Sequence, residues 1–458
     1  MLSDPHFDPF YDPAKLSELR RAPVTEWSAI LSRPDSATRV GTFSELQRAC
    51  GVRGTDSPWP LVLTAIREAK QTQPTPLFVI VSGDLLAHGF HCKFRQFEPS
   101  ATPAETSAFA AKAVSFLTQQ IRSVFPSVPI YFALGNNDSS CADYHETPDS
   151  AFLKSAAVSF AATIPDPEAR ASLSASFPRL GDYSVMLPGA MHNTRLIVLQ
   201  DIFQSSYYKR CSEEPDPAAA AEQIEWLRKQ LTDVRESGQQ AWVMAHIPPG
   251  IDVYTTYHRY LFAPGEACNV KQPQTFLSSG ALGDTIAEFG DVVGLAIFAH
   301  SHMDEIKLLH GPGDIAVPAK LVPSISPING NDPSFMVAQV SPKTATIKDY
   351  EVYSASNGQG VGWHREYRYS EVYHLPDFSA NSVEQLTSQL IADKSGEDEI
   401  SRTYERFFLS GGGTFAALGL QRLWPAYSCS LRERDPGAFH SCMCPSAAAQ
   451  PAAAPAIP

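Results

Sequence analysis

The chain has 458 residues, enough for one large domain with appendages or for two domains, and ample for a buried core. Hydrophobic residues make up 43% and charged residues 19%, which is typical of a globular protein and excludes a disordered one. The net charge of −13 argues against a broad basic surface, so no stable nucleic-acid partner is expected. The longest apolar run, residues 292–299, is too short to span a bilayer, so no transmembrane anchor is expected.

Four short apolar runs, each followed by polar residues, predict buried strands of a sheet. They lie at residues 77–82, 129–134, 241–245 and 293–299. The residues that follow them are Gly83 and Asp84, then Gly135, Asn136, Asn137 and Asp138, then His246, and finally His300 and His302. Amphipathic helices are predicted between the runs, over 106–125 and 222–235. Strands that alternate with helices indicate a layered α/β sheet, which keeps its sites beyond the carboxyl ends of its strands.

The sequence pattern changes after His302. Hairpin strands are predicted over 319–328, 335–340 and 344–353 and over the aromatic stretch 363–373, followed by helical segments within 382–408 and a break at Gly411–Gly413. We therefore expect a catalytic domain at 1–375, a helical, cysteine-bearing subdomain at 376–445 and a disordered Ala/Pro tail at 446–458.

The eight cysteines are even in number and lack zinc-finger spacing. Cys442 and Cys444 stand too close together for the usual metal-binding pair. We expect disulfides formed in an oxidising compartment, with a pairing that the sequence does not reveal; buried free thiols are the alternative. Residues 1–4 contain no signal-peptide pattern.

Seven polar side chains at or near the strand ends form the candidate site. Imidazole and oxygen donors in this proportion suit divalent zinc, manganese or iron. Seven donors exceed one tetrahedral shell, so two metals with Asp84 as a bridge fit better than one. Each motif alone has an ordinary interpretation, such as a turn or a hydrogen-bonded histidine, and the combination favours a site. The candidates are Asp4, His6, Asp84, Asn136, His246, His300 and His302.

The order of these motifs resembles the calcineurin-like metallophosphoesterase superfamily. Its pattern of D-x-H, G-D, G-N-x-[DE], a strand-end H and [GA]-H-x-H is matched at residues 4–6, 83–84, 135–138, 246 and 299–302. Finer features are similar to the acid sphingomyelinase-like phosphodiesterase branch, and the resemblance covers roughly 1–375. They are Asp4–Pro9, Cys50 followed by Asp56–Trp59, Gly83–His88, His246–Gly250 and Pro323–Pro327.

The resemblance implies a metallophosphoesterase β-sandwich flanked by helices. It also implies that a metal-bridging hydroxide attacks phosphorus, and that His88 acts beside the substrate phosphate and leaving group. One metal, zinc with manganese or iron as alternatives, would bind Asp4, His6, Asp84 and His302. The other would bind Asp84, Asn136, His246 and His300.

Two departures from the family pattern matter. Asn137 stands where a histidine is usual, and an amide donates a hydrogen bond to a phosphoryl oxygen but delivers no proton. The resulting G-N-N-D form also resembles endopolyphosphatase relatives. The strand that normally precedes D-x-H is reduced to Met1–Ser3, which suggests the loss of a longer N-terminus with a signal peptide.

The sequence thus predicts a monomeric, metal-dependent phosphodiesterase that cleaves phosphodiester or phosphoanhydride bonds. Its substrate would be a phosphodiester or a polyphosphate-type molecule, and its compartment secreted, periplasmic or lysosome/vacuole-like. Endopolyphosphatase-like activity, nucleotide pyrophosphatase activity and a catalytically silent binding module are the alternatives.

Overall fold

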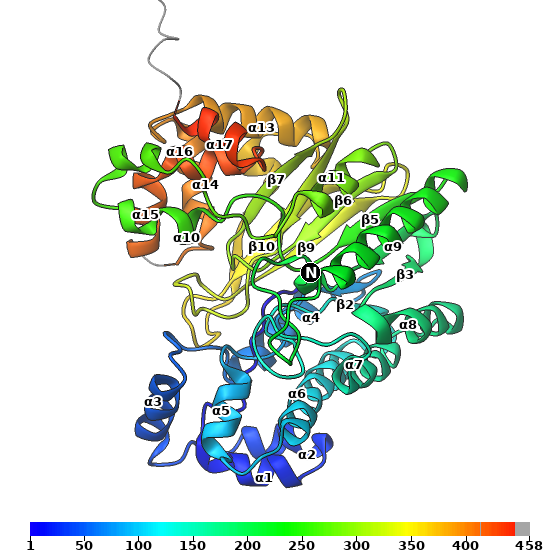
Figure 1. The fold of residues 1–458 in the computed structure, drawn as a ribbon, viewed down its shortest axis with the longest axis vertical. Helices are drawn as coiled ribbons and strands as arrows, with labels where there is room; N and C mark the ends of the chain where they lie inside the picture. Colours follow the sequence, from blue (N-terminus) through cyan, green and yellow to red (C-terminus); the bar gives the residue numbers. More distant parts are fainter. Residues whose placement is uncertain (413, 445–458) are drawn as a thin grey trace, which may run out of the picture.

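The computed structural model describes residues 1–412 and 414–444 (Figure 1). It contains the four predicted buried strands, β1 (Val79–Val81), β2 (Ile130–Phe132), β5 (Gln240–Met244) and β6 (Val293–Phe298). The layered α/β architecture expected from the sequence is confirmed.

One layer is a six-stranded mixed sheet in the order β3-β4-β5-β6-β8-β7. The strands β4, β5, β6 and β8 run parallel, whereas β3 and β7 pair antiparallel at the two edges. The carboxyl ends of β5 and β6 therefore meet at the same edge of the sheet. The strands not yet given are β3 (Tyr183–Met186), β4 (Thr194–Val198), β7 (Glu305–His310) and β8 (Ala316–Leu321).

The second layer contains the parallel pair β1-β2 and the antiparallel strands β9 (Ser334–Ser341), β10 (Thr346–Ser354) and β11 (His364–Arg368). Residues 1–3 lie between the two groups and join them. The Leu2 N–H donates to Ile80 O at 2.9 Å, and the Met336 N–H donates to Met1 O at 3.0 Å. Met1–Ser3 thus occupies the strand position directly before Asp4.

The aromatic stretch 363–373 is only partly a strand, which corrects the hairpin prediction. After β11 the chain forms the short helix α12 (Tyr369–Tyr373). The Asp349 carboxylate accepts hydrogen bonds from the Ser370 N–H at 3.1 Å and from its hydroxyl at 2.7 Å, and Tyr369 stacks on Tyr350. These contacts between distant segments outweigh the strand propensity of the aromatic side chains.

The space between the two layers is filled by one hydrophobic core. Trp242 and Leu295 from the six-stranded sheet share this core with Phe335, Ile347 and Val352 of the second layer. The helices α9 (Pro217–Glu236) and α11 (Ala281–Glu288) bury the other face of the six-stranded sheet in a separate core. Packed around β1, β2 and β9 are α4 (Trp59–Thr72), α6 (Pro103–Val124) and α7 (Ala151–Ala161).

Both long predicted helices begin earlier than expected, because capping residues lie upstream of their first apolar residue. Thr102 and Glu105 form a capping box before α6, with Pro103 at its first position. Asp216 caps α9 by accepting a hydrogen bond from the Ala219 N–H, and Pro217 follows it. The remaining helices of the first 375 residues are α1 (Leu16–Arg21), α2 (Val24–Leu31), α3 (Arg39–Ala49), α5 (Phe90–Phe97), α8 (Pro167–Leu180) and α10 (Val253–Tyr257).

The C-terminal region is helical, as predicted, and it covers one end of the sheets (Figure 1). The segment 382–408 forms two helices, because the Asp393 carboxylate accepts hydrogen bonds from the N–H groups of Ser395, Gly396 and Asp398 and turns the chain. The helices are α13 (Ala380–Ala392), α14 (Glu399–Phe408), α15 (Thr414–Arg422), α16 (Trp424–Ser430) and α17 (Pro436–Met443). Gly413 and the predicted tail 446–458 lie outside the described residues.

All eight cysteines are paired, which confirms the disulfide prediction. The bridges are Cys50–Cys92, Cys141–Cys211, Cys268–Cys444 and Cys429–Cys442. Four disulfides in one chain are typical of proteins that fold outside the cytosol. Within the part of the chain that the structure describes, every helix is too short or too polar to cross a membrane.

Candidate metal centre

The seven candidate ligands converge on one place at the edge where the carboxyl ends of strands from both layers meet. Asp84 follows β1, Asn136 follows β2, His246 follows β5, and His300 and His302 follow β6. Asp4 and His6 come directly after the segment that joins the sheets. Six of the seven are buried and His300 is partly exposed. The fold therefore brings together residues from five separate parts of the chain.

Most of these residues adopt an unusual backbone conformation. The left-handed region is uncommon for residues other than glycine, and strain of this kind clusters at functional sites. The positive φ angles are 43° at Asp4, 36° at His6, 51° at Asp84, 73° at His300 and 69° at His302. Bonds between loops hold this conformation, since the Asp4 N–H donates to Gly83 O at 3.1 Å and the His6 N–H to Asp84 O at 2.9 Å.

Two histidines point a ring nitrogen at the same carboxylate oxygen. The Nδ1 atoms of His6 and His246 each lie 2.9 Å from a carbonyl oxygen, of Leu86 and of Ser82 respectively, and a protonated Nδ1 leaves the Nε2 lone pair free. The two Nε2 atoms lie 3.4 Å and 3.2 Å from Oδ2 of Asp84. Asp84 is therefore the shared member of the cluster.

The charges suit cation binding. Burial lowers the pKa of His6 to about 4 and that of His300 to about 3, so both imidazoles are neutral in weak acid. Burial raises the pKa of Asp84, but His246 and His6 outweigh it and hold the pKa well below its usual range. Burial lowers the pKa of His246, yet Asp84 and then Asp4 raise it to about 10; a bound cation would displace that proton.

Asp84, His246 and His300 each offer a ligand atom within 4.8 Å of the others. Asn136 belongs to the same subset, because its Oδ1 lies 2.8 Å from Nδ1 of His300. The Asn136 amide nitrogen donates to Asp143 Oδ1 at 2.7 Å, which directs the amide oxygen toward His300.

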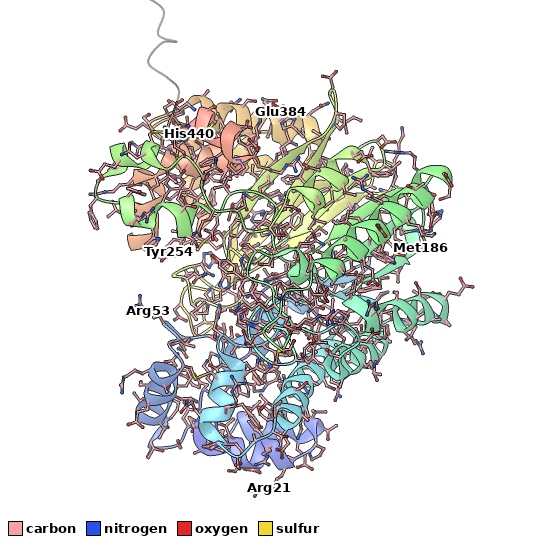
Figure 2. All side chains as sticks on the ribbon, viewed as in Figure 1. Arg21, Arg53, Met186, Tyr254, Glu384 and His440 are labelled. Atoms are coloured by element: carbon pink, nitrogen blue, oxygen red, sulfur yellow. A yellow bond between two sulfur atoms is a disulfide. The ribbon has the colours of Figure 1, made fainter. Side chains whose placement is uncertain are left out.

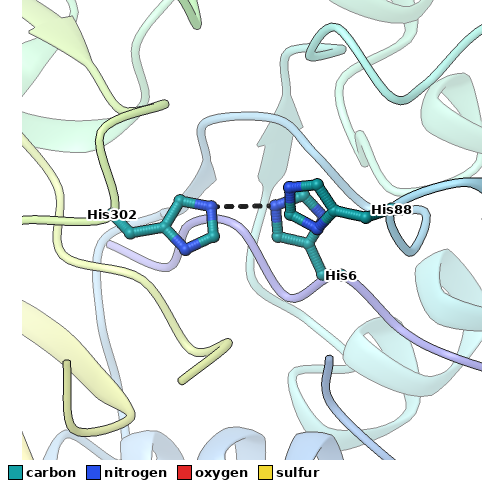
Figure 3. Close-up of side chains that lie close together, drawn as sticks. All are labelled: His6, His88 and His302. Atoms are coloured by element: carbon teal, nitrogen blue, oxygen red, sulfur yellow. Dashed lines mark hydrogen bonds between the residues drawn. The ribbon is translucent and has the colours of Figure 1, made fainter. Parts of the chain in front are cut away.

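A second subset of ligand atoms also includes Asp84. It contains Asp4 and His6, whose atoms also lie within 4.8 Å of those of Asp84. Figure 3 shows His302 facing His6, with their Nε2 atoms 3.1 Å apart, and the ring of His88 stacked over that of His6. Three imidazoles thus gather around one point.

Some buried polar atoms in the cluster make no hydrogen bond within the protein. Among the described residues, Oδ1 of Asp4, Nε2 of His246 and Nδ1 of His302 are buried without a hydrogen-bond partner. Buried polar atoms are nearly always satisfied, so such atoms in one cluster call for a ligand. Imidazole nitrogens and carboxylate oxygens suit borderline divalent metals. The donor set therefore fits divalent cations, and its number exceeds one tetrahedral shell.

His88, the predicted catalytic histidine, lies at the rim with 31% of its side chain exposed. Its Nδ1 lies 3.0 Å from Oδ1 of Asp56, and its backbone N–H donates to Oδ2 of Asp56 at 2.8 Å. Burial lowers the pKa of His88, but the Asp56 carboxylate outweighs this effect and raises it to about 9. His88 is thus a cationic hydrogen-bond donor beside the cluster.

Asn137, the other predicted catalytic residue, has its amide committed to a candidate ligand. Its Nδ2 donates to Oδ2 of Asp84 at 2.9 Å, and its backbone N–H donates to Oδ1 of Asp84 at 2.8 Å. The side chain is buried, so it fixes the orientation of the shared carboxylate.

The carboxylates that support the ligand loops were not among the predicted site residues. Asp138 accepts hydrogen bonds from the N–H groups of Leu85, Leu86 and Gly135. Asp201 accepts from the N–H groups at 246 and 247. Asp138 closes the G-N-N-D motif and Asp56 opens the D-S-P-W run, so both carried a signal; Asp201 carried none.

Two glycines are required where these loops meet. A Cβ at Gly83 would lie 2.6 Å from Nδ1 of His246, and φ there is 106°. A Cβ at Gly135 would lie 2.2 Å from Oδ1 of Asp84. Only glycine allows the two loops to approach each other this closely.

Comparisons with known proteins identify the family of this chain. The family model "Calcineurin-like phosphoesterase" matches residues 2–304. The human acid sphingomyelinase-like phosphodiesterase 3b is 26% identical over 411 residues, which cover 85% of this chain and 80% of that protein. A human cyclic GMP-AMP phosphodiesterase is 24% identical over 392 residues, covering 83% of this chain and 77% of that protein.

Among solved structures, a dimetal phosphatase from Danio rerio aligns with 69% of this chain and 89% of its own, at 11% identity and a TM-score of 0.37. This likeness is too weak to bear on activity. The family model alone covers well over half of the chain. The chain therefore belongs to the calcineurin-like phosphoesterase family, and it is a metal-dependent phosphoester hydrolase.

Proposed function

We propose that this chain hydrolyses phosphodiester or phosphoanhydride bonds at a centre of two divalent cations that share Asp84. The observation that carries the proposal is the convergence of His6 Nε2 and His246 Nε2 on Oδ2 of Asp84, at 3.4 and 3.2 Å. One cation would bind Asp4, His6, Asp84 and His302, and the other would bind Asp84, Asn136, His246 and His300. Zinc suits these donors, with manganese or iron as alternatives.

Two divalent cations, when bound, supply Lewis-acid activation of a water and of the phosphoryl oxygens. The chain's own residues orient the groups at the centre and supply a proton. His88, held by Asp56, presents a cationic donor that stabilises charge on the leaving-group oxygen or delivers a proton to it. Asn137 is a positioning residue, because its amide fixes Asp84 and an amide delivers no proton.

The preference for diesters over monoesters is supported by the names of the relatives. They are an acid sphingomyelinase-like phosphodiesterase and a cyclic GMP-AMP phosphodiesterase. The four disulfides support an oxidising compartment, secreted, periplasmic or lysosome/vacuole-like.

The proposal is tested by hydrolysis of bis(p-nitrophenyl) phosphate beside p-nitrophenyl phosphate, with added zinc or manganese and with a chelator. We expect metal-dependent turnover that favours the diester and close to two bound cations per chain. His246→Ala should lower turnover by at least about 100-fold. His192→Ala removes an exposed histidine outside the cluster and should leave turnover unchanged. Preference for the monoester, or no turnover at full metal occupancy, would overturn the proposal.

A further inference from the structure

We propose that Tyr144 and Tyr207 form an aromatic platform that stacks on the nucleobase of a nucleotide-containing substrate. This inference rests on the proposed function and names the substrate class of the same site. It starts from the subset of ligands that includes His300, whereas His88 lies beside His6 and His302. The platform and His88 therefore stand at different parts of the centre.

The platform begins within contact distance of a candidate ligand. The Tyr144 hydroxyl lies 3.3 Å from Nε2 of His300, and the Tyr144 N–H donates to Asn136 O at 3.0 Å. The rings of Tyr144 and Tyr207 lie 5.3 Å apart at 55°. Tyr207 has 50% of its surface exposed and so extends the aromatic surface from the centre into solvent.

Tyr144 adopts a conformation that bulky residues rarely take. Its φ is 58°, in the left-handed region, where a side chain of this size is a genuine outlier. Such strain persists only where the surrounding structure imposes it, and it concentrates at ligand-binding sites. In this conformation the Tyr144 N–H donates to Asn136 O, whose side-chain Oδ1 lies against His300.

The two tyrosines are fastened to each other by the segments that carry them. The disulfide Cys141–Cys211 joins these segments with a Cα–Cα distance of 5.9 Å. The Lys209 N–H donates to Tyr144 O at 3.2 Å, and the Tyr208 hydroxyl donates to Glu146 O at 3.2 Å. A platform held at both ends loses little conformational freedom when a ligand stacks on it.

A flat base fits this surface better than a quaternary ammonium group. Recognition of a quaternary ammonium uses a cage of aromatic faces. Here the rings of Tyr144 and Tyr207 are tilted against each other and form no cage, and Phe276 packs edge-on against the ring of His300 at 84°. A base needs only a ring to stack on and polar groups for its edge. The exposed side chain of Gln274, which accepts from the Tyr207 hydroxyl at 3.5 Å, provides such a group.

The test compares two esters that release the same p-nitrophenolate but differ in the group that stays on phosphorus. They are the p-nitrophenyl ester of thymidine 5′-monophosphate and p-nitrophenyl phosphorylcholine. In the full-length holoenzyme we expect Tyr207→Ala to raise KM for the thymidine ester about 5- to 150-fold, the loss of one base stack. The kinetics with phosphorylcholine should not change, and Tyr207→Phe, which keeps the ring, should remain close to wild type.

Tyr254→Ala serves as the matched control, because it removes a tyrosine that is 69% exposed and lies at the periphery beside the helical C-terminal region (Figure 2). Tyr254→Ala should leave the kinetics with both esters unchanged. Equal losses on both esters in Tyr207→Ala, or a loss confined to phosphorylcholine, would overturn the platform. If the wild type hydrolyses neither ester, the proposed function fails by itself. Calorimetric binding of thymidine 5′-monophosphate then still tests the platform. The same affinity for this nucleotide in wild type and in Tyr207→Ala would refute it.

Discussion

Asp138 ties together the two loops that carry Asp84 and Asn136. Its Oδ2 accepts hydrogen bonds from the N–H groups of Leu85 and Gly135, both at 3.0 Å, and its Oδ1 accepts from the Leu86 N–H at 2.8 Å. The carboxylate is fully buried, so water does not replace these acceptors without rearrangement of the loops. Asp138→Ala and Asp138→Asn should therefore differ in a way that follows from counting donors.

Asp138→Ala leaves three buried N–H groups without an acceptor. At about 1–3 kcal/mol for each unsatisfied group, the free energy of unfolding should fall by roughly 3 kcal/mol or more. Asp138→Asn retains one oxygen. In its best orientation the amide oxygen keeps two of the three bonds and the amide nitrogen faces the third N–H, so the loss should be roughly 1–3 kcal/mol.

Urea unfolding and the number of bound cations per chain should be measured together. Both variants should bind fewer cations, and the alanine variant fewer than the asparagine variant, because the loops separate further. Asp166→Ala is the control, since it removes a carboxylate that caps α8 and is not among the candidate ligands. It should cost about 1 kcal/mol and leave the cation content unchanged. An alanine variant no less stable than the asparagine variant would refute the reasoning.

Three further predictions concern pH, positioning and the cations. Burial, and then Asp304, raise the pKa of Glu366 to about 8. Between pH 4.5 and 8 the native state therefore holds a proton that the unfolded chain has released, and the free energy of unfolding falls as the pH rises through this range. Urea unfolding of wild type and Glu366→Gln should be measured at both ends of that range. The fall in the free energy of unfolding should be smaller in the variant by about 1–2 kcal/mol after solvent screening, and an equal fall in both proteins would contradict this. Asp56→Asn should lower kcat about 10- to 100-fold without loss of cations, because His88 loses the carboxylate charge that raises its pKa. Loss of cations would show instead that the centre itself was disturbed. Chelation should lower the free energy of unfolding by about 3 kcal/mol for each of the two cations, relative to protein held at a hundred times the dissociation constant, and zinc should reverse the loss. An unchanged Tm would argue against native-state binding.

The parts of the fold that could be predicted were those with a local signal. The strands β5 and β6 are continuous apolar runs, and each is followed by a histidine. The strands β3, β4 and β7 were not expected. β3 is a four-residue edge strand, too short for a clear pattern. β7 contains the buried Lys307, which donates to Ser430 O at 3.0 Å, so its polarity is resolved only by a contact with a distant segment.

The candidate ligands could be predicted from the sequence, whereas the roles of the groups that orient them could not, although Asp138 and Asp56 stand in recognisable motifs. Ligands are chemically conspicuous, because histidine and carboxylate at strand ends have few other uses in that order. Asp138 and Asp201 act through backbone N–H groups, which every residue carries. Their role depends on which loops meet, and this is decided by sheet order. The aromatic pair of Tyr144 and Tyr207 depends likewise on the pairing of Cys141 with Cys211, which cysteine counting leaves open.

The segment 323–327 shows how residues without metal-binding groups set the geometry of the centre. Pro323 and Pro327 limit the backbone at its two ends. Between them, the Ser326 N–H and the Ser324 hydroxyl donate to Asp4 O at 3.0 and 3.1 Å, and the Ser324 N–H donates to His302 O at 3.3 Å. Asp4 and His302 come from opposite ends of the catalytic region, and both have left-handed backbones that cost on the order of 1 kcal/mol each. One short segment therefore fixes the positions of two strained residues relative to each other. A change at Ser324 should disturb cation binding although its side chain binds no cation.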